Sequence, residues 1–509
     1  MKEIRTVGVV GAGAMGRGIV QIAAQAGLTV LLYDTSADAV AAARESLRQT
    51  WDKLTQKGKL DAGAAQAALE RVAPAAGLEA LADCDLVIEA IVERLDVKRE
   101  LFAKLEGIVG PDCILASNTS SLSITAIAAA CQRPQRVAGY HFFNPVPLMR
   151  VVEVIDGLRS APEAGDALAE LARRMGHTPV RAKDMPGFIV NHAGRGMNIE
   201  GLRVAQEGVA PYAQIDAIMR EQAGFRMGPF ELLDLTALDV SHPVMESIYR
   251  QFYDEPRFRP SPITAVRLAG GLLGRKAGEG FYAYADGQKQ QAAEPPAPPA
   301  QSGLKVWVSP RHPAGHARAT ELLARLGASL HNGADTPPAD ALIIVTPYGE
   351  DVSTAVYEQG LDAARTVALD TLHGLEPTRR RTLMVSPATQ PQWRDAAHGL
   401  LAGDGAPVSV VQDSAGFVAQ RVVASIVNVA CDIAQQRIAS PQDIDRAVTL
   451  GLGYPAGPLA MGDALGSARI LEILHNLLRV TGDPRYRPSL WLQRRVQLGL
   501  SLLADDASR

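Results

Sequence analysis

The sequence contains little cysteine, few aromatic residues and no long uninterrupted apolar run. Only four cysteines occur among 509 residues, and because none forms a C-x-x-C pair, neither a disulfide framework nor a metal site is indicated. Such a chain fits a reducing cytosol, so a cytoplasmic location is expected. No apolar stretch reaches the roughly 18 residues of a membrane helix, and no signal peptide precedes the first predicted strand.

A strong excess of charge of either sign is also missing. Lysine and arginine number 51 against 55 aspartates and glutamates, which gives a net charge of -4. Since no basic stripe alternates with aromatic residues, nucleic acid is not an expected partner. Apolar residues make up 47% of the chain, which is enough to form sizeable cores. The length predicts two to four domains.

Strand-like runs alternate with helical stretches over residues 1–183. The strands are expected at 6–10, 29–33, 85–90, 113–117 and 136–143, with a helix near 15–26 after the first. This rhythm is typical of a doubly wound α/β sheet. Over residues 184–286 the pattern changes to long helices with few strand signals, which predicts a separate helical domain.

The second part of the chain repeats the first. Residues 287–303 are rich in Gln, Ala and Pro and are predicted to form a semi-rigid linker. Strands are expected again within 304–411, at 305–308, 341–345, 366–369 and 382–385, and residues 412–509 return to helix. Similar residues in the two helical regions keep a constant offset of 229 (413 − 184, 445 − 216, 457 − 228 and 463 − 234). This constancy predicts an internal duplication.

A G-x-G-x-x-G motif directly follows the first predicted strand and begins a helix. It comprises Gly11, Gly13, Ala14, Met15 and Gly16. In such a motif the glycines allow a tight turn, a close approach to a pyrophosphate and the packing of helix on sheet. The helix N-terminus also offers free N–H groups to phosphates. The motif therefore predicts a dinucleotide site, rather than a glycine-rich turn without a ligand.

Asp34 ends the second predicted strand, 23 positions after Gly11 (34 − 11). Its carboxylate can accept hydrogen bonds from a ribose diol and would repel a 2′-phosphate, so NAD is favoured over NADP. An N-terminal helix cap is the alternative role.

The fold class predicted for the whole chain is an α/β Rossmann domain plus an all-α domain, then a degenerate second Rossmann-like domain and a second all-α domain.

The reacting groups are expected in and near the stretch His141-Phe-Phe-Asn-Pro145. Oxidation of an alcohol needs a base for the hydroxyl proton, and histidine has a suitable pKa without large tuning. Glu153 lies among valines, where a carboxylate is costly without a partner, and can orient His141. A hydrogen-bonded core histidine and a solvent-facing edge-strand glutamate are the alternatives. Ser120 and Asn191, taken alone, fit turn, cap or helix-surface positions better.

These residues resemble the 3-hydroxyacyl-CoA dehydrogenase family. The matching segments are GAGAMG (11–16), IEAIVE (88–93), SNTSSL (117–122), HFFNPVP (141–147), VVEVI (151–155), DMPGFIVN (184–191), GPFELLDL (228–235) and GRKAGEGFY (274–282). They follow the order and spacing of the family over residues 1–285. The duplicated arrangement is similar to a bacterial form of the family that serves phenylacetate degradation.

The resemblance implies a role for each matching residue. His141 matches the catalytic base and Glu153 its partner, while Ser120 and Asn191 match residues that hold the substrate oxygen. The implied cofactor contacts beyond the glycine motif are Asp34, Glu93, Lys98, Asn118, Ser120 and Asn144, and the implied coenzyme A contacts are Ser46 and Lys53. His192 departs from the family, which usually has arginine there, so one local contact is in doubt.

The second half is predicted to bind no NAD and to perform no chemistry. Its first strand leads to Ser309-Pro-Arg-His-Pro-Ala-Gly315, in which two prolines remove N–H donors that a pyrophosphate needs. Gln420 occupies the position of Asn191, and no HFFNP motif recurs. Because the helical domain resembles a dimerisation module of the family, the two copies are expected to form an internal pseudo-dimer, which leaves a further homo-oligomer open.

The function implied is the NAD-dependent oxidation of an (S)-3-hydroxyacyl-CoA to a 3-oxoacyl-CoA, in fatty-acid or phenylacetate catabolism. The substrate is expected to be of the 3-hydroxybutyryl-CoA or 3-hydroxyadipyl-CoA type. Arg195, Arg203 and Arg226 are candidates, by charge alone, to bind a distal carboxylate. Two alternatives stay open: a sugar-acid dehydrogenase resembling gulonate dehydrogenase and lambda-crystallin, and a non-catalytic binding protein built on a retired dehydrogenase.

Overall fold

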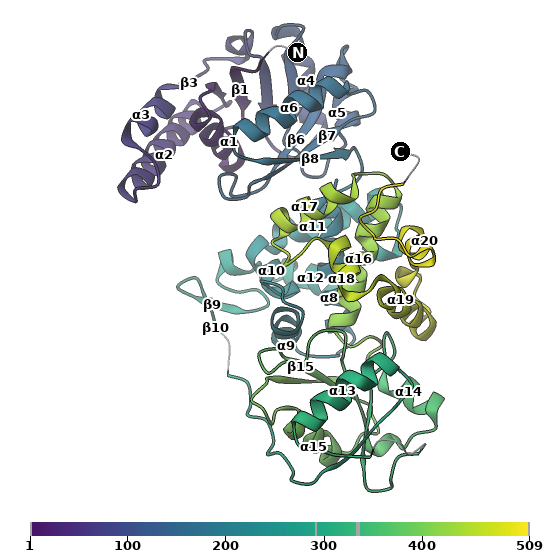
Figure 1. Cartoon of the computed structure of the whole chain (residues 1–509). Helices are drawn as coiled ribbons and strands as arrows, with labels where there is room; N and C mark the ends of the chain where they lie inside the picture. Colours follow the sequence, from purple (N-terminus) through teal and green to yellow (C-terminus); the bar gives the residue numbers. More distant parts are fainter. Residues whose placement is uncertain (1–2, 291–292, 332–335, 507–509) are drawn as a thin grey trace. The chain divides into compact units, whose positions relative to one another are not determined.

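The computed structural model describes residues 3–290, 293–331 and 336–506, and the chain divides into two compact units. The first unit contains residues 1–192 together with 436–453, and the second contains residues 193–435 together with 454–508. A short segment from late in the sequence therefore belongs to the unit that holds the N-terminal sheet. Figure 1 labels the elements of both units.

The first unit is built from strands and helices in alternation. Its strands are β1 (Thr6–Val10), β2 (Thr29–Tyr33), β3 (Val72–Pro74), β4 (Leu86–Glu89), β5 (Ile114–Ser117), β6 (Val137–Phe142), β7 (Val151–Asp156) and β8 (Thr178–Lys183). Its helices are α1 (Ala14–Gln25), α2 (Ala37–Gln56), α3 (Ala62–Glu70), α4 (Leu95–Ile108), α5 (Ile124–Ala128), α6 (Pro162–Arg174) and α17 (Pro441–Leu452), and α7 (Val190–Ala193) ends it.

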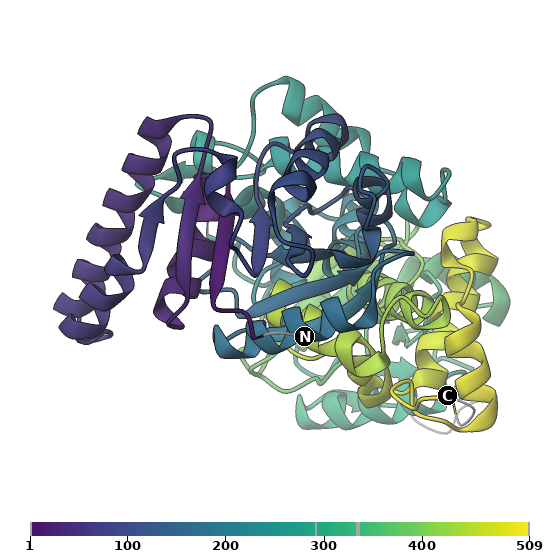
Figure 2. The same ribbon diagram turned by 90° about the horizontal axis from the view of Figure 1, so that it is seen from above.

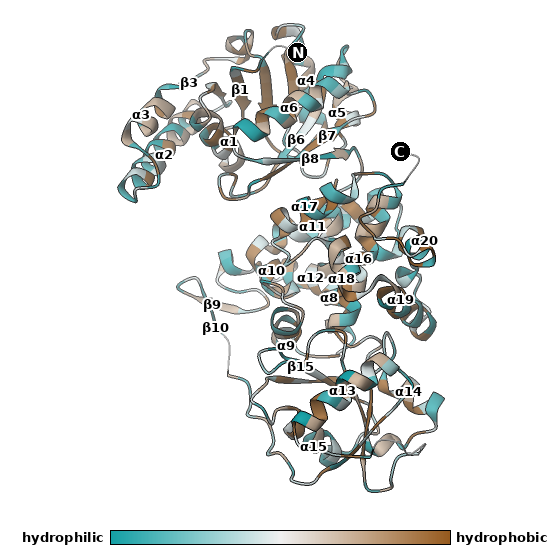
Figure 3. Cartoon of the chain, in the orientation of Figure 1, coloured by the Kyte–Doolittle hydropathy of each residue, from teal (hydrophilic) through white to brown (hydrophobic). Residues whose placement is uncertain are grey.

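These strands form an 8-stranded sheet in the order β3-β2-β1-β4-β5-β6-β7-β8. Neighbours are parallel except β6 and β7, which are antiparallel. The central strands are almost wholly apolar, as the brown colour of β1 in Figure 3 shows, because a sheet covered by helices on both faces buries both sides of each strand. The carboxyl ends of β1, β4 and β5 lie at one edge, where open α/β sheets bind their ligands.

The outer edge of β8 is covered by the late segment. The backbone N–H of Lys183 donates to the carbonyl oxygen of Ile438 with an N···O distance of 2.8 Å, and that of Arg181 donates to Oδ2 of Asp443 at 3.3 Å. Helix α17, which contains Asp443, begins at the Ser440 cap. An exposed strand edge is a liability that proteins normally cover, and here residues 436–453 cover it.

The second unit contains a helical part and a smaller sheet. Its helices are α8 (Arg195–Gln206), α9 (Tyr212–Ala217), the π-helical turn η3 (Ile218–Gln222), α10 (Pro229–Thr236), α11 (Leu238–Gln251), α12 (Pro262–Ala269), α13 (Pro313–Arg325), α14 (Val352–Gln359), α15 (Pro391–Leu401), α16 (Ala419–Gln435), α18 (Pro458–Leu465), α19 (Ser467–Thr481) and α20 (Leu490–Leu498). Its strands are β9 (Ala283–Ala285), β10 (Gln288–Gln290), β11 (Lys305–Val308), β12 (Ser329–Leu330), β13 (Leu342–Val345), β14 (Thr366–Leu369), β15 (Arg381–Val385) and β16 (Val408–Gln412).

The smaller sheet has 6 strands in the order β12-β11-β13-β14-β15-β16. All neighbours are parallel except β14 and β15. A single antiparallel pair followed by a last parallel strand is also the arrangement of β6, β7 and β8 in the first unit. The two sheets therefore share the topology of one edge.

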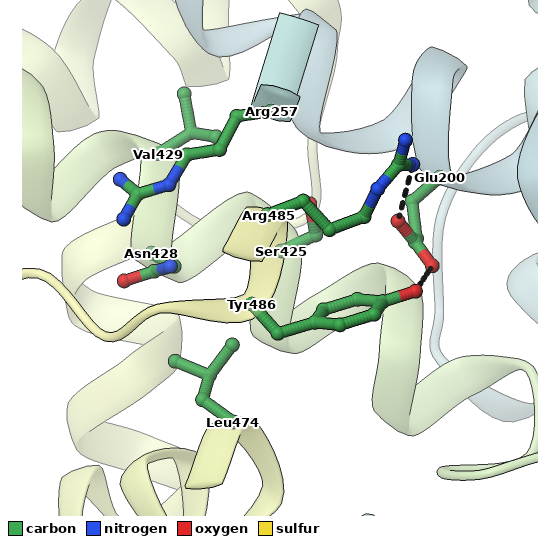
Figure 4. Close-up of a pocket in the computed structure, with 8 residues that line it drawn as sticks. All are labelled: Glu200, Arg257, Ser425, Asn428, Val429, Leu474, Arg485 and Tyr486. Carbon is green, nitrogen blue, oxygen red and sulfur yellow. Dashed lines mark hydrogen bonds and ion pairs between the residues drawn. The ribbon is translucent and has the colours of Figure 1, made fainter. Parts of the chain in front are cut away.

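Helices α8 and α16 cross closely in the helical part of the second unit. A Cβ added to Gly196 on α8 would lie 2.8 Å from Cα of Ile426 on α16, so the glycine is needed for this approach. Glu200 on α8 accepts hydrogen bonds from Arg421 and from the Tyr486 hydroxyl, with distances of 2.8 and 2.7 Å. Glu200 and Tyr486 also line the small polar pocket shown in Figure 4, where the carboxylate of Glu200 contacts both Arg485 and the hydroxyl of Tyr486.

The predicted elements agree closely with the structure. The strands at 6–10, 29–33, 305–308 and 366–369 are confirmed residue for residue, and the others agree to within two residues. Strands β3, β8, β12 and β16 were not predicted; β8, for example, contains a proline and two basic residues in six positions, which hide its apolar alternation. The predicted linker, 287–303, includes β10, which forms a hairpin with β9. No described helix is long and apolar enough to cross a bilayer.

Candidate active site

The glycine motif forms the turn between β1 and α1. Gly11 has φ +111, and a Cβ there would lie 2.4 Å from the carbonyl oxygen of Ala90, while a Cβ on Gly16 would lie 1.8 Å from the carbonyl oxygen of Gly11. By contrast, a Cβ on Gly13 would have no neighbour within 4 Å. Gly11 and Gly16 are thus required by packing, whereas Gly13 borders open space, as expected where a backbone approaches a pyrophosphate.

The first turn of α1 leaves its N–H groups available. Gly13 is the N-terminal cap, has no side-chain cap hydrogen bond, and is exposed together with Ala14. Met15 is half-buried and packs against the apolar core. Free N–H groups at the helix start and the positive end of its dipole suit a phosphate. The residues present therefore fit the dinucleotide.

Asp34 stands at the end of β2 beside this turn. Its Oδ2 accepts the N–H of Ala12 at 2.8 Å and its Oδ1 accepts the N–H of Ser36 at 3.0 Å. The side chain is only half-buried, so part of it remains accessible to a ligand. A ribose diol can donate to this carboxylate, whereas a 2′-phosphate would be repelled.

Glu93 and Lys98 lie near the ends of β4 and β5. Lys98 is 1% exposed and its Nζ lies 2.5 Å from Oε1 of Glu89 and 3.2 Å from Oε2 of Glu93. Burial raises the pKa of Glu93, but Lys98 and hydrogen bonds from Thr119, Ser120 and Ser121 outweigh it, so the pKa lies below its usual value. Lys98 thus links Glu89 and Glu93, and its proposed contact with the cofactor stays a prediction.

His141 and Glu153 meet across the antiparallel pair of β6 and β7. The register places them directly opposite each other, and Nδ1 of His141 lies 2.6 Å from Oε2 of Glu153. Because an ionised carboxylate only accepts, Nδ1 carries the hydrogen, and Nε2 is left as the proton acceptor. The ring also packs 4.4 Å from that of Phe143, centroid to centroid.

Glu153 is fully buried, and its second oxygen is held by the backbone. Oε1 accepts the N–H of Ile189 at 2.9 Å and that of Val190 at 2.8 Å. With the hydrogen from His141, the carboxylate accepts three bonds, which is what makes a buried charge tolerable. The alternative of a solvent-facing edge residue is therefore wrong for Glu153.

The loops around this pair carry the expected polar groups. Nδ2 of Asn191 lies 3.3 Å from the carbonyl oxygen of Ser120, which brings these two predicted residues together. Asn118 accepts the N–H of Phe142 through Oδ1 at 2.9 Å, so it joins the end of β5 to β6. Asn144 is exposed and lies two residues after the end of β6. Ser120 is half-buried and its hydroxyl lies 3.4 Å from Glu93, which links the two parts of the site.

Ser46 and Lys53 lie on α2, away from the histidine in sequence but on one helix face. They are seven positions apart, which is nearly two helical turns. Lys53 is exposed and Ser46 is half-buried. Figures 1 and 2 both show α2 running beside α3. An exposed ammonium on this face suits an anionic carrier.

Three polar residues of the site were not assigned a role from the sequence: Glu89, Ser117 and Thr119. Glu89 is fully buried, and its carboxylate accepts hydrogen bonds from Ser117 at 2.6 Å and from the N–H of Ile91 at 2.8 Å. Thr119 donates to Glu93 at 2.6 Å. A glutamate in the apolar run LVIEA was the available signal, of the same kind that pointed to Glu153.

The chain matches two family descriptions. The pattern of the "3-hydroxyacyl-CoA dehydrogenase, NAD binding domain" covers residues 6–185. That of the "3-hydroxyacyl-CoA dehydrogenase, C-terminal domain" covers residues 187–284 and, a second time, 416–502. The second match falls on the region predicted to repeat the first helical domain.

Individual relatives agree with these matches. The chain is 38% identical over 500 residues to 3-hydroxyadipyl-CoA dehydrogenase of Escherichia coli, with 98% of each chain covered. It is 43% identical to a probable 3-hydroxybutyryl-CoA dehydrogenase of Deinococcus radiodurans, which covers 54% of this chain and 99% of the relative. A crystal structure of 3-hydroxybutyryl-CoA dehydrogenase from Escherichia coli matches with a TM-score of 0.86 at 37% identity, covering 98% of this chain and 99% of that one.

The glycine turn and the order of the two kinds of domain thus agree with these matches. The first match corresponds to the Rossmann-type NAD-binding domain, and the second corresponds to the helical domain. The chain belongs to the 3-hydroxyacyl-CoA dehydrogenase family.

Proposed function

We propose that the chain oxidises an (S)-3-hydroxyacyl-CoA to the 3-oxoacyl-CoA with NAD as the hydride acceptor. The observation that carries this is the pairing of His141 with Glu153, 2.6 Å apart, in the unit that holds the glycine turn. Family membership supplies the cofactor and the reaction class. The two alternatives, a sugar-acid dehydrogenase and a non-catalytic binding protein, are not favoured by this family assignment.

His141 is proposed as the general base. Its Nε2 takes the hydroxyl proton of the substrate, while hydride leaves C3 and the C3–O bond becomes a carbonyl. The imidazolium that forms is stabilised by Glu153, which is held in turn by the backbone N–H groups of Ile189 and Val190. A positioned acid–base group of this kind contributes roughly 10²–10⁴ in rate.

Ser120 and Asn191 are proposed to hold the substrate oxygen beside His141. Their loops are joined by the hydrogen bond from Asn191 to the Ser120 carbonyl, so both would move together. Hydrogen-bond donors that are fixed before the reaction stabilise the developing charge without reorganisation. Ser46 and Lys53, on the exposed face of α2, are proposed to bind the coenzyme A portion.

The acyl group is proposed to be a short chain of the 3-hydroxybutyryl or 3-hydroxyadipyl type, which would place the protein in fatty-acid or phenylacetate catabolism. The names of the relatives divide between these two acyl groups. Arg203 is already bound to Glu207 at 2.7 Å, and Arg195 is 7% exposed. Arg226 is exposed, so its guanidinium is the most accessible of the three.

We also propose that the second half is a duplicated, degenerate copy without activity. The shared edge topology of the two sheets and the second match of the helical domain support this. Helix α13 begins at Pro313, which has no N–H group to offer a pyrophosphate. The tight crossing of α8 and α16 supports an internal pseudo-dimer.

A cytoplasmic location is part of this proposal. Cys84, Cys113 and Cys131 are free thiols, and Cys84 and Cys113 are buried. Burial raises the pKa of the Cys84 thiol to about 12, so this thiol is unreactive, as is usual for a structural cysteine. Free thiols such as these are typical of a reducing compartment.

The experiment is a spectrophotometric assay of NADH formation with the purified full chain. We expect turnover with NAD and (S)-3-hydroxybutyryl-CoA or (S)-3-hydroxyadipyl-CoA, and the ratio of kcat/KM for these two decides the acyl group. His141→Gln should lower kcat by about two orders of magnitude or more. Oxidation of gulonate without a CoA thioester would instead support the sugar-acid alternative, and absence of turnover with every substrate would support the binding protein.

A further inference from the structure

The late segment 436–453 and an early segment of the helical region make the same contact with the two sheets. On the first sheet, Lys183 N donates to Ile438 O at 2.8 Å; on the second, Gln412 N donates to Val209 O at 2.9 Å. The donors differ by 229 positions (412 − 183), and so do the acceptors (438 − 209). Each half of the chain therefore covers the edge of the other half's sheet.

The helices that follow these contacts carry different residues at one equivalent position. Gly451 is on α17, and Gln222, 229 positions earlier (451 − 222), ends η3. Gln222 is 1% exposed. Its Nε2 donates to Oδ2 of Asp370 at 2.8 Å, and its Oε1 accepts the hydroxyl hydrogen of Thr382 at 2.5 Å.

Asp370 and Thr382 occupy the positions of the proposed catalytic pair. Asp370 corresponds to His141 (370 − 141 = 229) and Thr382 to Glu153 (382 − 153 = 229). The strand register agrees, because His141 is opposite Glu153 and the N–H of Asp370 donates to the carbonyl oxygen of Thr382. In the second unit the side chain of Gln222 therefore bonds to both Asp370 and Thr382 and occupies the space between its helix and these two residues.

In the first unit the equivalent helix position is Gly451, which carries no side chain. A Cβ at Gly451 would lie 3.0 and 3.1 Å from the two methyl groups of Val190, and 3.6 Å from Val151. Val190 is the residue whose N–H donates to Glu153, and Asn191 follows it. The first distances are tighter than ordinary van der Waals contact, so any side chain at 451 would press on the segment that fixes Glu153 and Asn191.

We propose that Gly451, contributed by the C-terminal half, is a positioning residue for the dehydrogenase reaction. Its missing side chain lets α17 seat against Val190, which keeps the Val190 N–H on Glu153 and keeps a side chain of α17 away from the His141–Glu153 pair. The second half is then required for chemistry although it performs none. This inference rests on the proposed roles of His141 and Glu153.

The test compares Gly451→Gln with Leu450→Gln in the full chain. Leu450 is the adjacent residue on α17 and is 38% exposed, so it controls for a glutamine on this helix. We expect Gly451→Gln to keep NADH affinity but to lower kcat about tenfold or more, as displacements near 1 Å can do. An amide that donates to Glu153 would weaken the stabilisation that this carboxylate gives to the imidazolium of His141. The acidic limb of the pH profile of kcat/KM should therefore move to lower pH.

A smaller change tests the contact with Val190. Gly451→Ala should lower kcat by less than the glutamine variant does, and in a protein that already carries Val190→Ala the further change Gly451→Ala should have no effect on kcat. An unchanged kcat and pH profile in a folded Gly451→Gln protein would overturn the inference. If that protein does not fold, an unchanged kcat in Gly451→Ala overturns it instead. Wild-type kcat in His141→Gln would instead contradict the proposed role of His141 itself, which keeps the two failures distinct.

Discussion

Oε2 of Glu153 lies 2.6 Å from Nδ1 of His141, while Oε1 of the same carboxylate is occupied by two backbone N–H groups. The two oxygens are therefore not interchangeable. Oε1 accepts hydrogen bonds from the backbone, and Oε2 determines which nitrogen of His141 carries the hydrogen.

Glu153→Gln should consequently lower kcat by about two orders of magnitude or more. The amide oxygen of the glutamine must accept from Ile189 and Val190, so its NH₂ group faces Nδ1 of His141. The histidine would then carry its hydrogen on Nε2 and could not accept the substrate proton. Stopped-flow measurement of NADH formation checks this.

Glu163→Gln is a matched control, because Glu163 is an exposed residue in the first turn of α6. It should show wild-type turnover. Wild-type kcat in Glu153→Gln would mean that the carboxylate does not set the tautomer of His141.

Gly13→Ala and Gly16→Ala should separate cofactor binding from folding. A Cβ at Gly13 meets nothing within 4 Å, whereas one at Gly16 would lie 1.8 Å from the Gly11 carbonyl oxygen. We expect Gly13→Ala to keep its Tm and to bind NADH at least about tenfold more weakly, since the backbone could no longer approach a pyrophosphate. Gly16→Ala should lower the Tm, because the backbone itself must shift.

Differential scanning calorimetry and NADH fluorescence titration measure the two properties separately. Equal loss of Tm in both variants would contradict this division of roles. So would unchanged NADH affinity in Gly13→Ala.

Asp34→Ser should reduce the preference for NAD over NADP. Removing the carboxylate takes away a ribose acceptor and a charge that repels a 2′-phosphate, and a change of about 1.4 kcal/mol corresponds to tenfold. The ratio of kcat/KM for NAD to that for NADP should therefore fall by about tenfold or more. Asp34→Asn keeps an acceptor for the N–H of Ala12 and loses only the charge, so it shows how much of the effect is electrostatic. A ratio that stays constant in both variants would exclude Asp34 from cofactor choice.

The sequence was most informative where one residue type has few possible roles. A glutamate between valines needed a partner, and a histidine was the nearest suitable one; the structure pairs Glu153 with His141 through the register of β6 and β7. The positions of β1, β2 and β14 followed from short apolar runs bounded by turn residues. These signals are local, so a single sequence is enough to reveal them.

Contacts between distant segments could not be predicted in this way. Nothing near Lys183 indicates that its N–H will donate to Ile438, because the pairing depends on how the late segment returns to β8. The constant offset of 229 suggested a duplication, but only the folded chain pairs Gln222 with Asp370 and Thr382. Propensity and periodicity describe single elements, whereas this network depends on three of them.

The Gln222–Asp370 network should contribute stability and not activity. Asp370 accepts hydrogen bonds from Gln222, from Gln420 at 2.9 Å and from the N–H of Leu372 at 3.0 Å. Asp370→Asn would place an NH₂ group against the NH₂ group of Gln222, and turning the Gln222 amide would relieve this only by giving up the hydrogen bond that Thr382 donates. An unsatisfied buried polar group costs about 1–3 kcal/mol, so the free energy of unfolding should fall by that amount while kcat stays at the wild-type value.

The double variant Asp370→Asn with Gln222→Glu provides the rescue. It restores an acceptor opposite the new NH₂ group, still accepts from Thr382 and keeps one buried carboxylate, so stability should return toward wild type. Urea unfolding gives the free energies, and the NADH assay gives kcat on the same samples. If the double variant were as unstable as the sum of the two single changes, the network would not act as a unit. If Asp370→Asn abolished turnover without unfolding, the second half would hold a chemical role that the proposed function denies it.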